Sequence, residues 1–165
     1  MGLLINSLLF NIIWLTAVLA KMPILAFTLA ALWACIPQTC RPSPRPVLLI
    51  FAIGLAVDAM LVASGFMVFD PTNVPAYVLV TLWAAFAYFC GIFFYFKPLK
   101  IWQYALLGLV SGPSSYWAAH KLDAVTIDWS AMPQLLIFFS FWFVALPMFH
   151  QLIRREKCKS HVTSY

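Results

Sequence analysis

Six apolar stretches, separated by short polar or proline-containing segments, account for almost the whole chain. At 1.5 Å per residue in a helix, each stretch can cover a hydrocarbon core of ~30 Å, although the second is short. The pattern therefore predicts an all-α, polytopic membrane helix bundle with about six transmembrane helices. The predicted helices are Leu3–Ala20, Ile24–Thr39, Val47–Phe69, Ala76–Phe96, Ile101–His120 and Met132–Gln151.

The connections differ in how clearly they are marked. The segments Cys40–Pro46 and Asp70–Pro75 are rich in turn residues, and Pro98 interrupts the chain after Lys97. Proline and clustered turn residues end helices, so these boundaries are well defined. We predict one helix-bundle domain over residues 1–150, followed by a basic cytoplasmic tail over residues 151–165 that is disordered.

Composition agrees with a bilayer environment: 64% of the residues are hydrophobic and 9% are charged. A soluble domain of 165 residues could not bury so much apolar surface. The net charge of +5 does not indicate nucleic acid, because the basic residues are confined to short connecting segments and the tail. We expect them to set topology and to contact anionic headgroups, with the lipid bilayer as the main partner.

The distribution of Lys and Arg predicts the orientation. One set of connections carries eight basic residues and the other carries two, and the richer side is expected in the cytoplasm. Both termini would then be cytoplasmic in a multi-pass protein. A cleaved signal peptide over residues 1–20 is the alternative, although that segment lacks a basic start. The eight residues are Arg41, Arg45, Lys97, Lys100, Arg154, Arg155, Lys157 and Lys159.

No metal or cofactor is indicated. The four cysteines have no CxxC spacing, and the three histidines lie at the ends of predicted helices or in the tail. Nucleotide and hydrolase motifs are also absent, so we expect no cofactor.

Asp58 is the only charged residue inside the third stretch. An acid near the centre of a membrane helix costs at least ~2.5–3.5 kcal/mol unless the fold compensates it. At 100° per residue, Gly54 and Gly65 fall close to the direction of Asp58. A face of small residues admits another helix or a ligand, so we predict that Asp58 points into the bundle.

The fifth stretch carries a stripe of small residues, Gly108, Gly112, Ser115 and Ala119, with Ser111 at its edge. Such a stripe is typical of a helix-packing surface without chemistry of its own. Pro113 lies in the same helix, where a proline is expected to produce a kink. Kinked membrane helices often border a cavity, which is the alternative interpretation.

Four further side chains are candidates for a functional or buried polar role. Tyr116, Trp117 and His120 share one face after Pro113, where His120 could relay protons or simply anchor the helix in the headgroup region. Asn11 lies near the middle of the first stretch and could donate a hydrogen bond to Asp58 or act as a helix-packing residue.

These motifs resemble an uncharacterised family of small bacterial inner-membrane proteins, catalogued as domain of unknown function family 2878. The resemblance rests chiefly on Gly54 to Asp58 with Gly65 and on the segment Gly108–Ala119. Ser111 departs from the pattern, since a second glycine is common there. The resemblance implies the bacterial inner membrane and carries over no activity. Genes of family members tend to lie beside lipid-modifying enzymes, which implies a lipid-related role.

Three functional hypotheses follow, in decreasing order of preference. The first is an accessory protein that binds other membrane proteins or lipid-modifying enzymes, with Asp58 as a structural acid. The second is a lipid-binding bundle or small proton-coupled transporter that uses Asp58. The third is a membrane-embedded lipid-modifying enzyme with Asp58 as base and His120 as acid, which a single central acid and a peripheral histidine support poorly.

Overall fold

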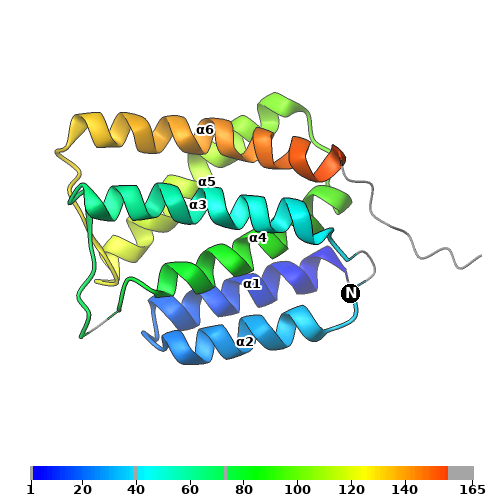
Figure 1. Ribbon diagram of the computed structural model, residues 1–165, viewed down its shortest axis with the longest axis horizontal. Coiled ribbons are helices and arrows are strands. Elements are labelled where there is room, and N and C mark those ends of the chain that lie inside the picture. The colour runs from blue at the N-terminus through cyan, green and yellow to red at the C-terminus, as the bar shows by residue number, and fades with distance from the viewer. Residues whose placement is uncertain (1, 39–40, 73, 156–165) are drawn as a thin grey trace, which may run out of the picture.

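The computed structural model describes residues 2–38, 41–72 and 74–155. It contains six helices that run up and down along a common long axis, as Figure 1 shows. The predicted all-α bundle is confirmed, and, apart from the end of the third, the helices begin and end within a few residues of the expected positions. They are α1 (Leu3–Val18), α2 (Pro23–Cys35), α3 (Pro44–Ala63), α4 (Val78–Phe96), α5 (Ile101–Lys121) and α6 (Met132–Arg155).

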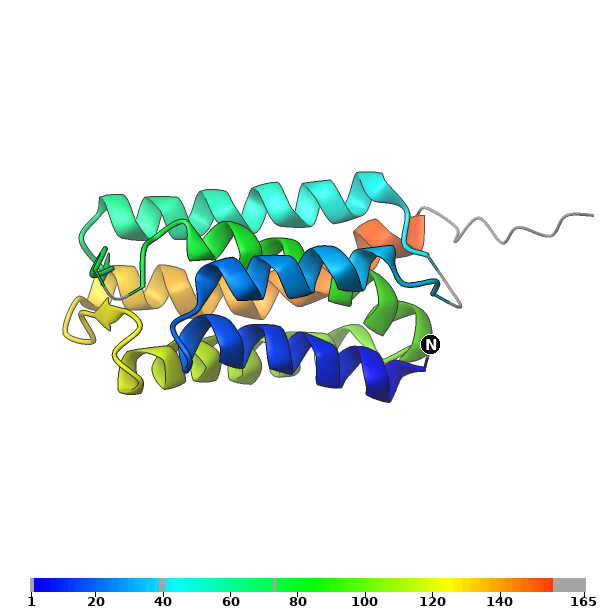
Figure 2. The ribbon, with the colours of Figure 1, turned by 90° about the horizontal axis from the view of Figure 1, so that it is seen from below.

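Helix α4 lies at the centre of the bundle and packs against α1, α2, α3 and α6. Its aromatic side chains fill the space between these neighbours. Trp83 is buried and stacks on Trp142 of α6, with ring centroids 5.8 Å apart, while Phe86 meets both indoles edge-on. Helix α5 packs chiefly against α6, and both α1 and α5 follow the lower edge of the bundle in Figure 2.

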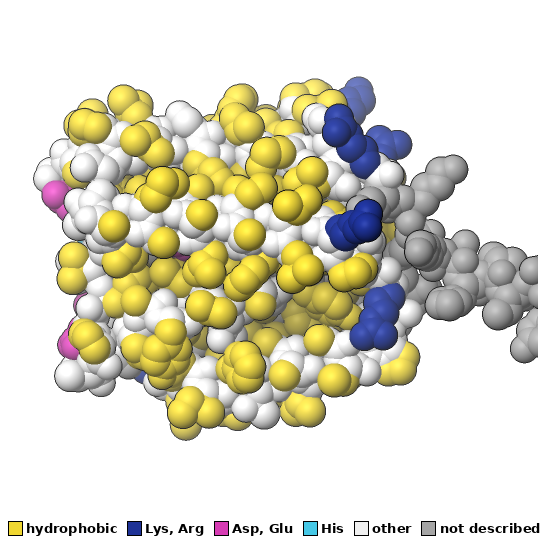
Figure 3. All heavy atoms as spheres, in the orientation of Figure 1, with side chains coloured by type: hydrophobic (Ala, Val, Ile, Leu, Met, Phe, Trp, Pro, Cys, Tyr) yellow, Lys and Arg dark blue, Asp and Glu magenta, His cyan; other side chains and the backbone are white. Residues whose placement is uncertain are grey.

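The outer surface between the two ends of the bundle is largely apolar (Figure 3). Large hydrophobic side chains are exposed on each helix, for example Leu4, Ile24 and Leu136. In the described residues, α3, α4 and α6 are long and apolar enough to cross a membrane, whereas α1 and α2 are apolar but shorter. A surface of this kind is expected to face lipid rather than water.

The third helix ends earlier than predicted. The sequence suggested a helix through Phe69, but α3 stops at Ala63 and Gly65 follows in a turn with φ of +75°. The prediction that Gly65 belongs to the packing face beside Asp58 is therefore wrong. Glycine adopts this left-handed conformation without the steric cost that other residues incur, so Gly65 ends the helix instead.

A small sheet replaces the last part of the predicted third helix. Strand β1 (Met67–Val68) pairs antiparallel with β2 (Thr126–Ile127), which follows α5. The apolar run continued through this segment because Phe66 and Met67 are buried under the end of the bundle, each with 1% of its surface exposed. Burial in a short strand and burial in a helix leave the same apolar signal in so short a segment.

The C-terminal helix is longer than predicted. The proposed disordered tail begins at residue 151, but α6 continues to Arg155. Disorder is therefore wrong for residues 151–155, and the rest of that predicted tail, residues 156–165, lies outside the described residues.

Candidate functional site

Asp58 lies on α3 with 1% of its surface exposed, and two hydrogen bonds converge on one of its carboxylate oxygens. The indole Nε1 of Trp83 donates to Oδ2 over 2.6 Å, and the hydroxyl of Tyr116 donates to the same atom, also over 2.6 Å. Short bonds to an ionisable oxygen are among the stronger hydrogen bonds in proteins. Asp58 thus connects α3 to α4 and α5.

Gly54 explains how the indole of Trp83 reaches this acid. Gly54 lies one helical turn before Asp58, and a Cβ at this position would collide with the Trp83 ring. The absence of a side chain lets the indole lie flat against α3, with its nitrogen directed at the carboxylate. The glycine on this face therefore positions a hydrogen-bond donor, which is more specific than a general packing role.

Tyr116 is brought to Asp58 by the close packing of α5 on α6. A Cβ on Gly112 would collide with the indole of Trp142, and one on Gly108 with the Trp142 backbone carbonyl oxygen. These two glycines let α5 approach α6, and Tyr116 then contacts Phe138 edge-on with centroids 5.1 Å apart. The small-residue stripe thus lies at a helix contact, and its position sets the position of Tyr116.

Pro113 lies inside α5, and the helix continues through it to Lys121. The hydroxyl of Ser114 donates to the Ser111 carbonyl over 3.1 Å, and that of Ser115 donates to the Gly112 carbonyl over 2.8 Å. Proline removes the donor that would bond the carbonyl of residue 109, so these hydroxyls do not replace the lost bond. Their oxygen atoms can still accept hydrogen bonds from another group on this part of α5.

A groove of about 550 Å³ borders Asp58, between α1, α4 and α5. Aromatic and aliphatic side chains form most of its wall, including Phe10, Trp14 and Leu82. Polar groups are few and come from Asp58, Tyr116, Asn11, Ser111, Ser114 and Ser115. A mostly apolar cavity with a small number of polar groups is typical of a ligand site.

Asn11 is not the donor to Asp58. Its amide nitrogen donates to the Ser7 carbonyl within α1 over 2.8 Å, and the exposed side chain contributes to the groove wall. The fully buried amide of α1 is Asn6, whose oxygen accepts a hydrogen bond of 2.8 Å from Trp33 Nε1 of α2. At 100° per residue Asn6 and Asn11 face different sides of α1, but helical phase alone does not tell which side meets another helix.

His120 and Trp117 lie away from the acid. The Nδ1 atom of His120 accepts a hydrogen bond of 3.2 Å from the Ile127 backbone N–H, which ties α5 to β2. Trp117 is exposed, and the Lys121 ammonium lies 5.9 Å from the centre of its ring. Neither residue borders the groove. The structure therefore does not bring His120 to Asp58 as an acid–base pair.

Trp83 is the important residue that the sequence did not single out. It was one of many aromatic residues in the fourth apolar stretch, and nothing in that run distinguishes a donor to a buried acid from a packing residue. The one available signal was the glycine four residues before the acid, which lets a side chain of a neighbouring helix approach the carboxylate closely.

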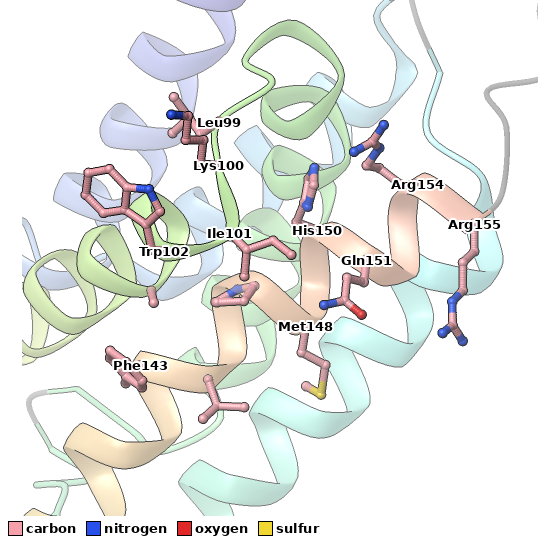
Figure 4. A pocket seen from close by; sticks show the side chains of 13 residues that line it. Leu99, Lys100, Ile101, Trp102, Phe143, Met148, His150, Gln151, Arg154 and Arg155 are labelled. Carbon is pink, nitrogen blue, oxygen red and sulfur yellow. The ribbon is translucent and has the colours of Figure 1, made fainter.

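A second cavity, of about 1100 Å³, lies between the beginning of α5 and the last turns of α6 (Figure 4). Its wall combines apolar side chains such as Phe143 and Met148 with the cations of Lys100, Arg154 and Arg155. The sequence predicted that these cations set the topology and contact anionic headgroups, but it did not predict that they border one cavity.

Neither cavity shows the features of a metal centre. In the part of the chain that the structure describes, no three His, Cys, Asp or Glu side chains are grouped so that they could hold a metal ion.

Comparison with known proteins places the chain in a family but not beside a characterised protein. No curated protein and no solved structure matches it. Residues 3–148 match the family described as "Protein of unknown function (DUF2878)". Because this match spans most of the 165 residues, the chain belongs to that family.

Proposed function

We propose that the protein is a multi-pass membrane protein whose groove between α1, α4 and α5 binds a lipid or similar amphiphile. The observation that carries this proposal is the position of Asp58: a buried acid, fixed through one oxygen by Trp83 and Tyr116, borders the groove. An acid inside a membrane helix is costly to insert, so one that borders a cavity is by default a candidate for a functional residue.

The membrane setting is supported by the division of charge between the two ends. Lys and Arg side chains gather at the end where α3 begins and α6 ends, and acidic side chains lie at the opposite end (Figure 3). Excess Lys and Arg mark the cytoplasmic side, so both termini are assigned to the cytoplasm. The bacterial plasma membrane is what the family resemblance implies. Helices α1, α2 and α5 complete a six-span bundle in this arrangement.

The chemistry of the groove supports an amphiphile as its occupant. Its aromatic and aliphatic wall fits a hydrocarbon body. Ser111, Ser114 and Ser115 offer hydroxyl groups along one side, and Asp58 offers a carboxylate at a single point. An apolar molecule that carries one hydroxyl or amine would satisfy both features.

A matched pair of substitutions on α5 tests this proposal. Ser111→Phe places a bulky ring in the groove, whereas Val110→Phe places the same ring on the adjacent outward position, where Val110 is 66% exposed and does not border the groove. Lipid retained by each protein after detergent purification would be measured by mass spectrometry. We expect Ser111→Phe to lose bound lipid that wild type and Val110→Phe retain; equal retention in all three would contradict the proposal.

An accessory role is the second candidate, favoured by the way Asp58 is held. A buried acid with a purely structural role would also need two donors such as Trp83 and Tyr116. In that case the groove could bind a helix of a partner protein, such as a lipid-modifying enzyme. Asp58→Asn keeps an oxygen for both donors. Unchanged lipid retention and a lost cellular phenotype in that variant would favour the accessory role, whereas changed lipid selection would favour lipid binding or proton-coupled transport.

A further inference from the structure

We propose that the cavity between α5 and α6 binds an anionic phospholipid of the cytoplasmic leaflet, with its phosphate between Lys100 and Arg154. This site is separate from the groove at Asp58 and depends only on the proposed membrane setting.

The cavity changes from apolar to cationic along its length, as a phospholipid does. Toward the middle of the bundle its wall is formed by Phe143 and Val144, which are 47% and 56% exposed. At the end of the bundle it is bordered by Lys100 and Arg154. Figure 4 shows Arg154 projecting from α6, with Lys100 across the cavity at the beginning of α5.

The length of the cavity matches one leaflet. From Phe143 to Arg154 the α6 axis rises by about 16 Å. Half of a ~30 Å hydrocarbon core is ~15 Å, so with a headgroup at Arg154 the acyl chains would run along α6 and end near Phe143. A free phosphate would use only the cationic end and would leave the exposed apolar wall uncovered.

Among the described residues, no acidic side chain lies at the end of the bundle that carries Lys100 and Arg154. The chain has five acidic residues, and the four in the described residues lie elsewhere: Asp58 is in mid-helix, while Asp70, Asp123 and Asp128 follow α3 or α5 at the opposite end. The fifth, Glu156, lies outside the described residues. Anionic headgroups of the cytoplasmic leaflet complement such a cluster, at about 1 kcal/mol per Lys or Arg.

One polar group in the wall has no partner. His150 is 3% exposed and borders the cavity, and its ring lies 4.3 Å from that of Tyr104 between centroids. Among the described residues its Nδ1 atom has no hydrogen-bond partner. A buried polar atom without a partner is costly, so a polar ligand group at this wall would improve the environment of the imidazole after a small adjustment of the ring.

The test compares two pairs of substitutions that remove the same charge from the same end. The cavity pair is Lys100→Gln with Arg154→Gln, and the control pair is Arg45→Gln with Lys97→Gln, which do not border the cavity. Binding of phosphatidylglycerol and of phosphatidylcholine to the purified full-length protein would be measured by native mass spectrometry. Glycerol phosphate serves as the headgroup without acyl chains.

We expect wild type and the control pair to prefer phosphatidylglycerol, and the cavity pair, which lacks two cations, to bind it about thirtyfold more weakly. Equal weakening in both pairs would indicate nonspecific attraction and overturn the proposal. Absence of a preference in wild type would do the same, as would glycerol phosphate binding as tightly as the lipid. Should the cavity pair fail to fold, Val144→Trp, which obstructs the apolar wall alone, should weaken phosphatidylglycerol binding to a similar extent.

Discussion

The groove at Asp58 and the cavity at Lys100 and Arg154 both border α5, but they differ in what compensates their charged side chains. The groove holds one buried acid whose hydrogen bonds come from Trp83 and Tyr116, so the protein itself supplies the compensation. The cavity holds exposed cations without a matching acid on its described walls. A charge in the middle of the bundle is compensated within the fold, whereas charges at its end are left for the surroundings.

The largest effect should come from separating α5 from α6, because both regions depend on this contact. Gly108→Leu would drive a side chain into the Trp142 carbonyl, and overpacking against backbone has no easy relaxation. We expect a loss of at least ~3 kcal/mol in the free energy of unfolding, measured by thermal unfolding in detergent. Val110→Leu, on an exposed position of the same helix, is the control. A stable Gly108→Leu protein would refute the close contact.

Removing the acid should affect the groove and spare the cavity. Asp58→Ala leaves the Trp83 indole N–H and the Tyr116 hydroxyl without their acceptor, and we expect a destabilisation of about 2–4 kcal/mol. Asp58→Asn retains an oxygen acceptor and should cost about 1 kcal/mol. Phosphatidylglycerol binding at the other end should be unchanged in the Asn variant. Equal destabilisation by Ala and Asn would show that the two hydrogen bonds do not stabilise the acid.

A smaller effect is expected from deleting one donor. Tyr116→Phe keeps the ring packed against Phe138 and removes only the hydroxyl that bonds Asp58. A single hydrogen bond to a buried acid suggests a loss of about 1–2 kcal/mol, which chemical denaturation can resolve. Combining Tyr116→Phe with Asp58→Ala, which removes the acceptor, gives a double-mutant cycle. Strictly additive losses would mean that the two side chains do not interact.

The smallest effect should appear at the acidic end, in the dependence of stability on pH. Hydrogen bonds from the Thr72 hydroxyl and N–H lower the pKa of Asp70, and those from Ser130 lower the pKa of Asp128. A carboxyl whose pKa is lower in the folded state stabilises the fold above its unfolded pKa, near 4, and this contribution disappears as the pH falls through the folded value. Thr72→Ala and Ser130→Ala should flatten the acid limb of the stability profile; an unchanged limb would contradict this assignment.

The sequence predicted the elements of the two regions better than their contacts. Apolar runs located six helices because a membrane helix and a buried helix leave the same long signal. Helical phase placed Gly54 on the side of Asp58, and the stripe at Gly108 and Gly112 indicated a helix contact. Phase describes one helix at a time, however, and does not identify its neighbours.

The two predictions about Asp58 that failed, at Asn11 and Gly65, depended on information beyond a single helix. Asn11 was at a plausible depth for pairing with Asp58, but Trp83 occupies that position because Gly54 leaves room for its ring. Gly65 matched the helical phase, yet the chain had already turned toward β1, which pairs with a strand far along the sequence. The cavity at Lys100 and Arg154 lies where the start of α5 meets the end of α6. Hydrophobic periodicity within one helix does not predict a contact between two helices.

The most direct test of the contrast between the two regions is photolabelling with diazirine-bearing phospholipids, followed by peptide mapping. With dilute probe and the full-length protein in nanodiscs, segments around Asn11 and Ser114 should be labelled by neutral and anionic lipids alike. Segments around Val144 should be labelled preferentially by the anionic probe. Uniform labelling of outward-facing residues such as Leu4, Ile24 and Leu136, without enrichment at either region, would contradict the account.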